Sequence, residues 1–199
     1  MARQAERREA TQGAILAAAL RLFGESGFAS VSVDEIAAAA GVAKGAVYHH
    51  FPSKEALFEA VFERAAEQLQ QRVHAGAAGS GDRLRAMAAG ARAYFEACAQ
   101  PPFERIILKD GPAVLGWDRW REIDERYSLA LVRTPLARLM RAGVLQQRPV
   151  DLLARVVLAA LTEAGMAVAA AADRQAARRE AEELVTALLE GFRTAPGPD

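Results

Sequence analysis

Two short helices joined by a tight turn are predicted by the stretch Ser32-Val-Asp-Glu-Ile-Ala-Ala-Ala-Ala-Gly-Val-Ala-Lys-Gly-Ala-Val-Tyr-His-His-Phe51. Ser32 is followed three residues later by Glu35, which is the spacing of a capping box, so a helix is expected to begin directly after Ser32. Gly41 can adopt the left-handed backbone conformation that ends this helix and turns the chain. The second helix is expected to cover residues 44–50.

Three positions in this stretch have the residue types that a helix-turn-helix requires. The motif needs a small residue where its helices cross, a permissive residue in the turn and an apolar residue that holds the second helix. Ala37, Gly41 and Val47 fill these positions. The N-terminal third of the chain is therefore interpreted as a DNA-binding head.

The composition indicates a helical protein of one or two domains. The chain has 199 residues, which is enough to bury a sizeable core. Alanine and leucine are prominent and β-branched runs are scarce, which favours helices. The single cysteine, Cys98, cannot form an internal disulfide, and the charged N-terminus lacks the apolar stretch of a secretion signal. These features predict a cytoplasmic protein.

One segment, Leu152–Ala172, is apolar enough to be mistaken for a membrane span. It contains Arg155 and Glu163, and a charge in the middle of a spanning helix costs about 2.5–3.5 kcal/mol. A helix buried among protein neighbours is the preferred interpretation, so no membrane partner is expected.

The charge balance constrains how the head could bind DNA. The formal net charge of the chain is zero, and residues 1–60 carry six Arg or Lys against seven Asp or Glu. Binding then requires the basic side chains to gather on one surface with the acidic ones turned away. A basic N-terminal arm that reaches the DNA and a solvated tail are equally compatible with the sequence. The arm would contain Arg3, Arg7 and Arg8, and the basic side chains that must gather on one surface are these three with Lys44 and Lys54.

An all-α architecture with three parts is expected: a helix-turn-helix head over residues 1–55, a helical body for effector binding and dimerisation over residues 56–193, and a disordered tail over residues 194–199. Pro52 ends the recognition helix and Ser53 caps the next one. Residues 111–116 are expected to be irregular, and Pro135 to interrupt a helix over residues 117–142. The remaining helices are expected from residues 6–11 to 25, from Ser53 to residues 75–82, and over 82–99, 103–110, 150–172 and 173–192.

Residues 11–62 resemble the DNA-binding domain of the TetR family of one-component transcriptional regulators. The resemblance rests on the gapless runs 14–28, 32–37 and 40–58. It implies an all-helical homodimer with a C-terminal ligand-binding body, usually a repressor that leaves double-stranded DNA when a small-molecule effector binds. Ala43 departs from the family pattern, which has Ser or Thr there as a helix cap; losing such a cap costs about 0.5–2 kcal/mol.

The resemblance also implies the DNA-contact positions, which are Ser32, Lys44, Gly45, Tyr48, His49 and Lys54. Val47 and Phe51 are assigned to the core, and a ring partly in the core is the alternative for Tyr48. His49 and His50 do not predict a metal site, because adjacent helical residues point about 100° apart. No metal or other cofactor is expected.

In the body, several aromatic and aliphatic residues would converge if the helices pack as in the family, and apolar clefts with a few polar groups are typical small-molecule sites. Ordinary core packing is the alternative for each of them. Glu163 interrupts an apolar helix, as an effector anchor or as part of a dimer seam. The effector candidates are Phe103, Ile107, Trp117, Trp120, Tyr127 and Glu163, with Phe95, Ile106 and Leu131 among the converging residues.

The last two helices are more apolar than one subunit needs, which predicts a four-helix dimer interface. Two-fold pairing would place two recognition helices about 34–36 Å apart, so the operator should be roughly palindromic. The interface candidates are Leu153, Val156, Val157, Ala160, Ala164, Leu184, Val185, Leu188, Leu189 and Phe192.

Two other classes of protein were weighed. An enzyme is disfavoured, because the sequence has no glycine-rich phosphate loop, nucleophile motif or metal-spaced cluster. A helical protein–protein interaction module without DNA binding stays open, with the neutral head and Ala43 as support.

Overall fold

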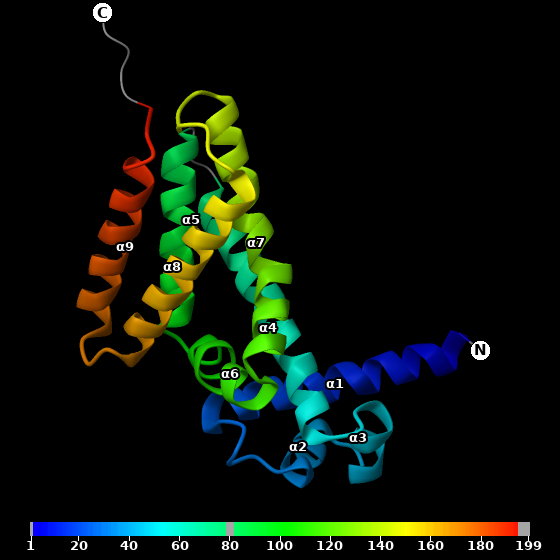
Figure 1. Cartoon of the computed structure of the whole chain (residues 1–199). Helices are drawn as coiled ribbons and strands as arrows, with labels where there is room; N and C mark the ends of the chain where they lie inside the picture. Colours follow the sequence, from blue (N-terminus) through cyan, green and yellow to red (C-terminus); the bar gives the residue numbers. More distant parts are fainter. Residues whose placement is uncertain (1, 79–81, 195–199) are drawn as a thin grey trace, which may run out of the picture. The chain divides into compact units, whose positions relative to one another are not determined.

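The computed structural model describes residues 2–78 and 82–194, and the regular elements in these ranges are helices (Figure 1). The predicted all-α fold is confirmed. One isolated backbone bridge joins Leu145 and Arg193. Two expectations fall outside the described residues: the disordered tail from residue 195 onward and the role of the Arg3 side chain. Residues 79–81, within the stretch where the helix from Ser53 was expected to end, are not described either.

Two compact units make up the chain. Unit 1 comprises Met1–Ala66 with Pro101–Arg121, and unit 2 comprises Glu67–Gln100 with Glu122–Asp199. Two of the three boundaries between them fall inside helices, α4 (Lys54–Ala77) and α7 (Trp117–Arg141), and the third lies between Gln100 and Pro101. This division differs from the one expected after residue 55, because a segment of the expected body belongs to unit 1.

The N-terminal part of unit 1 contains α1 (Ala2–Ser26), α2 (Val33–Ala40) and α3 (Lys44–His50). Helix α1 begins earlier than expected, whereas α2 and α3 have the predicted bounds. The rings of Phe23, Phe28 and Phe58 pack together, with centroid distances of 5.6, 5.5 and 5.2 Å. This cluster joins α1 to α4 and supports the two short helices.

The predicted turn signals are present. Gly41 has φ 68°, and its N–H donates to the carbonyl oxygens of Ala37 and Ala38, which ends α2. The Ser53 hydroxyl accepts a hydrogen bond from the Ala56 N–H at 3.0 Å, which caps α4. The helix-turn-helix is confirmed.

Residues 101–121 pack within unit 1 although they are far from its other residues in sequence. They form a π-helical segment, η1 (Glu104–Asp110), and a short helix, α6 (Gly111–Leu115). The expectation of an irregular chain at 111–116 was wrong. Pro112 lies in the first turn of α6, where a backbone N–H would have no intrahelical acceptor, so proline does not disturb the helix there. The Asp110 carboxylate accepts a hydrogen bond from the Phe28 N–H at 2.7 Å, which ties the segment to the head.

Gly111, the first residue of α6, is closely packed within unit 1. A Cβ at this position would lie 2.7 Å from the Phe62 ring, 2.9 Å from the Ile106 carbonyl oxygen and 2.9 Å from the Trp120 ring. We expect Gly111→Ala to lower the free energy of unfolding by about 1–3 kcal/mol, because the backbone oxygen cannot move aside. Urea denaturation measures this change.

Gly13→Ala is the matched control for that prediction. Gly13 is an exposed residue inside α1, and a Cβ there would meet nothing within 4 Å. Alanine should therefore stabilise the helix by up to about 1 kcal/mol. Equal unfolding curves for Gly111→Ala and the unchanged protein would contradict the close packing of α6.

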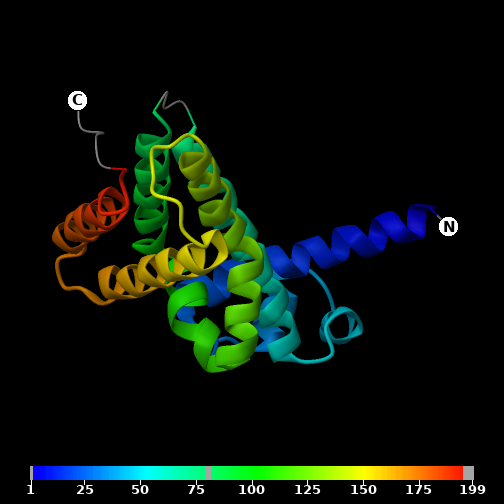
Figure 2. The same ribbon diagram turned by 45° about the horizontal axis from the view of Figure 1, so that its top comes forward.

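Unit 2 contains the rest of α4 and α7 with α5 (Arg83–Cys98), α8 (Val150–Ala170) and α9 (Arg174–Glu190) (Figure 2). Helix α7 continues through Pro135, which was expected to interrupt it. Proline removes one backbone N–H, but Val132, Leu136 and Leu139 of the same stretch are buried in the core of unit 2. This packing holds the helix together.

Helix α8 alone among the described helices is long and apolar enough to cross a membrane by composition. One of its faces is buried in the core of unit 2, through residues such as Leu153, Ala154, Val157 and Leu161. This placement favours the sequence-based interpretation of a core helix.

Candidate DNA-binding surface and effector cavity

The recognition helix α3 has one buried face and one accessible face. Val47 is 1% exposed and Phe51, just after the helix, is buried, as predicted for core positions. Tyr48 is 45% exposed, so its ring is not a core residue. Lys44, Gly45 and His49 are exposed as well. The accessible face thus presents the Lys44 amine, the Gly45 backbone, the Tyr48 hydroxyl and the His49 imidazole.

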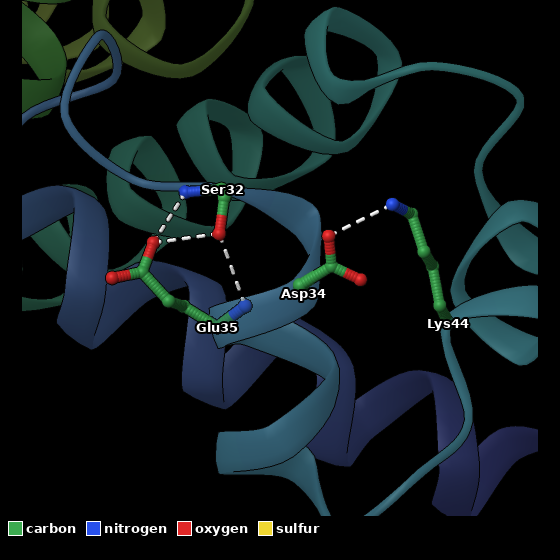
Figure 3. Close-up of polar contacts among 4 residues, drawn as sticks. All are labelled: Ser32, Asp34, Glu35 and Lys44. Carbon is green, nitrogen blue, oxygen red and sulfur yellow. Dashed lines mark hydrogen bonds and ion pairs between the residues drawn. The ribbon is translucent and has the colours of Figure 1, made fainter.

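Ser32 is fully engaged in a capping box at the start of α2 (Figure 3). Its backbone N–H and its hydroxyl each donate to Glu35 Oε2 at 2.7 Å, and the hydroxyl accepts from the Glu35 N–H at 3.2 Å. The hydrogen bond from the Ser32 backbone is the main reason that the pKa of Glu35 is lowered. A Ser32 hydroxyl that donates to a DNA phosphate would have to release Glu35 first.

Lys44 forms an ion pair across the turn between α2 and α3. Its Nζ lies 2.8 Å from Asp34 Oδ2, and both side chains are more than half exposed (Figure 3). The hydrogen bond to Asp34 is the main reason that the pKa of Lys44 is raised, so the amine stays charged. Sequence reasoning treated Lys44 as an available cation and missed its ion pair with Asp34, with which a bound phosphate would have to compete.

The cap of α3 and the position of Lys54 complete the surface. Ala43 is the N-cap of α3 and makes no side-chain hydrogen bond, as its apolar side chain requires. Lys54, in the first turn of α4, places its Nζ 4.3 Å from the centroid of the Phe28 ring. This cation–π contact keeps the amine at the surface of the head.

The two neighbouring histidines have different environments. His49 is exposed, whereas His50 is half-buried, and its pKa is lowered by burial first and then by the charges of His49 and Arg8. Arg8 of α1 therefore lies near the C-terminal end of α3. Among the described residues, no group of three or more His, Cys, Asp or Glu side chains is placed to hold a metal ion.

Unit 2 contains a partly open cavity of about 440 Å³, which lies in the usual size range of small-molecule sites. Five helices, α4, α5, α7, α8 and α9, contribute to its wall. Most of the lining is aliphatic, and six lining side chains are polar. The described lining residues are Leu69, Val73, His74, Ala77, Arg83, Ala86, Met87, Gly90, Ala91, Tyr94, Ser128, Ala130, Leu131, Val132, Thr134, Pro135, Arg138, Val157, Leu158, Leu161, Val185 and Leu189.

Tyr94 is the last α5 residue in the lining of the cavity, and it is partly buried near the fully buried Cys98. Its pKa is raised well above the usual range, first by burial and then by the Cys98 thiol and the Asp124 carboxylate. Burial also raises the pKa of Cys98 to about 12. Gly165 makes room for the phenol, because a Cβ there would lie 2.9 Å from the Tyr94 hydroxyl. Both groups are thus neutral and inert near pH 7.

The six effector candidates from sequence do not line this cavity. Phe103, Ile107 and Trp120 are buried in unit 1, where Trp120 Nε1 donates to the Ile107 carbonyl oxygen at 2.9 Å. Trp117 is exposed in the same unit. Tyr127 and Glu163 belong to unit 2 but lie outside the lining, whereas Leu131 is part of it. The sequence analysis selected mainly aromatic residues as effector candidates. The cavity is instead lined largely by alanine, glycine and aliphatic residues, which nothing in the sequence marks as part of a binding site.

The dimer-interface candidates divide by exposure. Leu153, Val157, Val185 and Leu189 are buried in the core of unit 2 itself. Val156 is 50% and Leu184 is 71% exposed, and Leu152, which was not proposed, is 64% exposed. The other four candidates, Ala160, Ala164, Leu188 and Phe192, are half-buried.

Both parts of the chain match known protein families. Residues 15–61 match the family described as "Bacterial regulatory proteins, tetR family", and residues 84–192 match "Tetracyclin repressor-like, C-terminal domain". The second match alone covers more than half of the chain. The chain belongs to the TetR family.

Individual TetR-family relatives agree with this assignment. A solved structure of a TetR-family transcriptional regulator from Pectobacterium atrosepticum has a TM-score of 0.84 and 30% identity, covering 96% of this chain and 98% of that one. The regulator CymR from Pseudomonas putida is 46% identical over 72 residues, 36% of each chain. The activator FasR from Mycolicibacterium smegmatis is 34% identical over 89 residues, 45% of this chain and 41% of the relative. The matches thus span less than half the length of these two curated relatives.

The assignment to the TetR family identifies the chain as a transcriptional regulator with a helix-turn-helix. Members of this family are regulatory proteins and not enzymes. Within this family fold, the accessible face of α3 is the candidate DNA surface, and the cavity of unit 2 is the candidate effector site.

Proposed function

We propose that this protein is a cytoplasmic, homodimeric repressor that binds a palindromic operator and releases it when a small molecule occupies the cavity of unit 2. The observation that carries the proposal is the accessible face of α3. Val47 and Phe51 hold this helix in the core, while Lys44, Tyr48 and His49 point to solvent. A short helix presented in this way is suited to the major groove of DNA.

Two helices could link the cavity to the DNA surface. The lining includes Leu69 and Val73 of α4 and Leu131 of α7, and both helices continue into unit 1. A ligand that packs better against one arrangement of these helices than another shifts the population of the DNA-binding form. This link supports an effector-controlled regulator over the alternative, a helical interaction module without DNA binding.

Selection of genomic DNA fragments on the purified protein tests the proposal. We expect recovery of fragments with a roughly palindromic site, including one upstream of the protein's own gene. A reporter gene under that site then separates repression from activation, which matters because FasR is named an activator. Failure to bind any palindrome at low salt would favour the interaction module.

The ion pair between Lys44 and Asp34 leads to a prediction about operator affinity. Asp34→Asn removes the carboxylate that holds Lys44 Nζ at 2.8 Å and would repel a phosphate. We expect the variant to bind the operator severalfold more tightly, with the gain shrinking as salt increases. Fluorescence anisotropy at two or more salt concentrations measures this effect.

Asp118→Asn is the control for that prediction, because it removes one exposed carboxylate of unit 1 outside the α2–α3 turn. It should change operator affinity less than Asp34→Asn does. If Asp34→Asn instead bound the operator more weakly, the ion pair would be holding Lys44 in position for DNA and would not be competing with a phosphate for it.

A further inference from the structure

The cavity of unit 2 is basic. Among its lining residues that the structure describes, none is an aspartate or a glutamate. Two are arginines, Arg83 and Arg138, and a third, His74, can carry a positive charge. The remaining polar side chains are the hydroxyls of Tyr94, Ser128 and Thr134. A cationic ligand would find no partner charge in this lining.

Two of the hydroxyls already have protein partners. Ser128 Oγ donates to Asp124 Oδ1 at 3.1 Å. The Tyr94 hydroxyl is hydrogen-bonded to the side chains of Thr162 and Cys98. Because these hydroxyls already have hydrogen-bond partners in the protein, a ligand needs no polar group near Tyr94, and an apolar part of a ligand fits there.

The two arginines lie toward the other end. Arg83 is the first residue of α5, and Arg138 is in the last turn of α7. Figures 1 and 2 show these two helix ends at the same end of unit 2. Hydrogen bonds from the backbone of Arg85 and Leu84 are the main reason that the pKa of Asp82, next to Arg83, is lowered, and the charge of Arg193 lowers it further. The backbone of Arg193 pairs with Leu145, just beyond α7, which agrees with the two helix ends lying near each other.

Neither arginine has a partner among the described residues. Other arginines of unit 2 form ion pairs with carboxylates, among them Arg133 with Asp151 and Arg178 with Glu96. Arg83 and Arg138 are therefore the charged donors that a ligand in the cavity can use. A guanidinium donates two parallel hydrogen bonds to a carboxylate, which gives both affinity and orientation.

Resting on the proposed effector function, we propose that the effector is a small organic carboxylate with an apolar body. Its carboxylate binds Arg83 and Arg138, and its body extends along the aliphatic wall toward Tyr94. On α5 that wall runs from Met87 to Tyr94, which corresponds to about 10 Å of helix. A medium-length acyl chain or a phenylalkyl chain matches this length.

Calorimetric titration of the purified full-length protein tests the proposal with octanoate, decanoate and 4-phenylbutanoate as probes. Each acid is compared with its primary amide and with the amine of the same length. We expect the acid to bind about tenfold or more tightly than its amide, and the amine to bind most weakly. Added salt should reduce the preference for the acid, because the arginines are exposed.

Arg83→Gln combined with Arg138→Gln should lower the affinity for the acid to that for the amide and leave the amide unchanged. Arg85→Gln combined with Arg141→Gln is the matched control, since these exposed arginines lie on the same helices outside the lining. Its preference for acids should persist. Met87→Trp, which fills the cavity, should abolish binding of acid and amide alike.

Several results would overturn the proposal: equal affinity for acid and amide, preference for the amine, an acid preference that survives loss of both arginines, or no binding of any acid. If Met87→Trp does not fold, the arginine variants still decide. None of these titrations contains DNA, so they can fail while operator binding succeeds. A protein that binds the acids but no operator would instead refute the proposed function.

Discussion

A variant carrying both Val156→Glu and Leu184→Glu is expected to be a folded monomer that loses operator binding. Both side chains are at least half exposed in the subunit, so neither change uncovers the core of unit 2. In the proposed dimer both would be buried, and a buried charge without a partner is strongly destabilising. Sedimentation should show one subunit mass. Operator affinity should fall about a hundredfold or more, because each monomer then binds one half-site without its neighbour.

Val185→Glu is the contrasting variant. Val185 is buried in the core of unit 2 on the same helix as Leu184, so its replacement should unfold unit 2 instead of dissociating a dimer. Deleting α9 would test pairing less clearly than the two glutamates, because the deletion would also remove Ala181 and Leu189 from the core of unit 2. If the Val156→Glu and Leu184→Glu variant kept the mass of a dimer, pairing would have to use another surface.

Loss of both Lys44 and Tyr48 is expected to have the second-largest effect. Both side chains are exposed on α3, so Lys44→Ala with Tyr48→Ala should leave the thermal unfolding of the protein nearly unchanged. Operator affinity should fall about a hundredfold, because a phosphate or base contact is lost at each position in both half-sites. Anisotropy titration and circular dichroism together separate lost contacts from lost structure.

Three variants refine that experiment. Tyr48→Phe keeps the ring and removes the hydroxyl, so it should reproduce the Tyr48→Ala loss if the hydroxyl binds a phosphate. Lys54→Ala should reduce the slope of log affinity against log salt by roughly one for each half-site. Arg21→Ala is the control, since Arg21 is an exposed base of unit 1 that pairs with Glu25. Unchanged affinity in all the α3 variants would refute the contact assignment.

The helix-turn-helix could be predicted residue by residue because its signals are local. The Ser32–Glu35 capping box and the left-handed Gly41 act within a few residues of the positions that they define. Val47 could be assigned to the core because helical spacing determines which side of a short helix faces inward. The same reasoning located the cap at Ser53, and the helices expected from residues 82 and 173 onward begin just after Asp82 and Asp173, whose side chains accept backbone hydrogen bonds.

Features that depend on packing between distant segments could not be predicted in this way. The Lys44–Asp34 pair forms only once the turn sets the distance between two helices. The cavity is shaped by five helices, and small residues such as Gly90 and Ala91 make space without any sequence signature. The aromatic effector candidates lie elsewhere: Phe103 and Trp120 are buried in unit 1, whereas Tyr94, which lines the cavity, was not singled out.

The hydrogen bond between the Phe28 N–H and Asp110 has a consequence for engineering. A fragment that ends at residue 66 would keep the whole helix-turn-helix. It would lack Asp110, which accepts the hydrogen bond from the part-buried Phe28 N–H, and Gly111 of α6, which packs near Phe62. Chimaeras that graft this operator specificity onto a foreign sensor should therefore carry residues 101–121 along with the first 66. A single splice point cannot transplant the specificity intact.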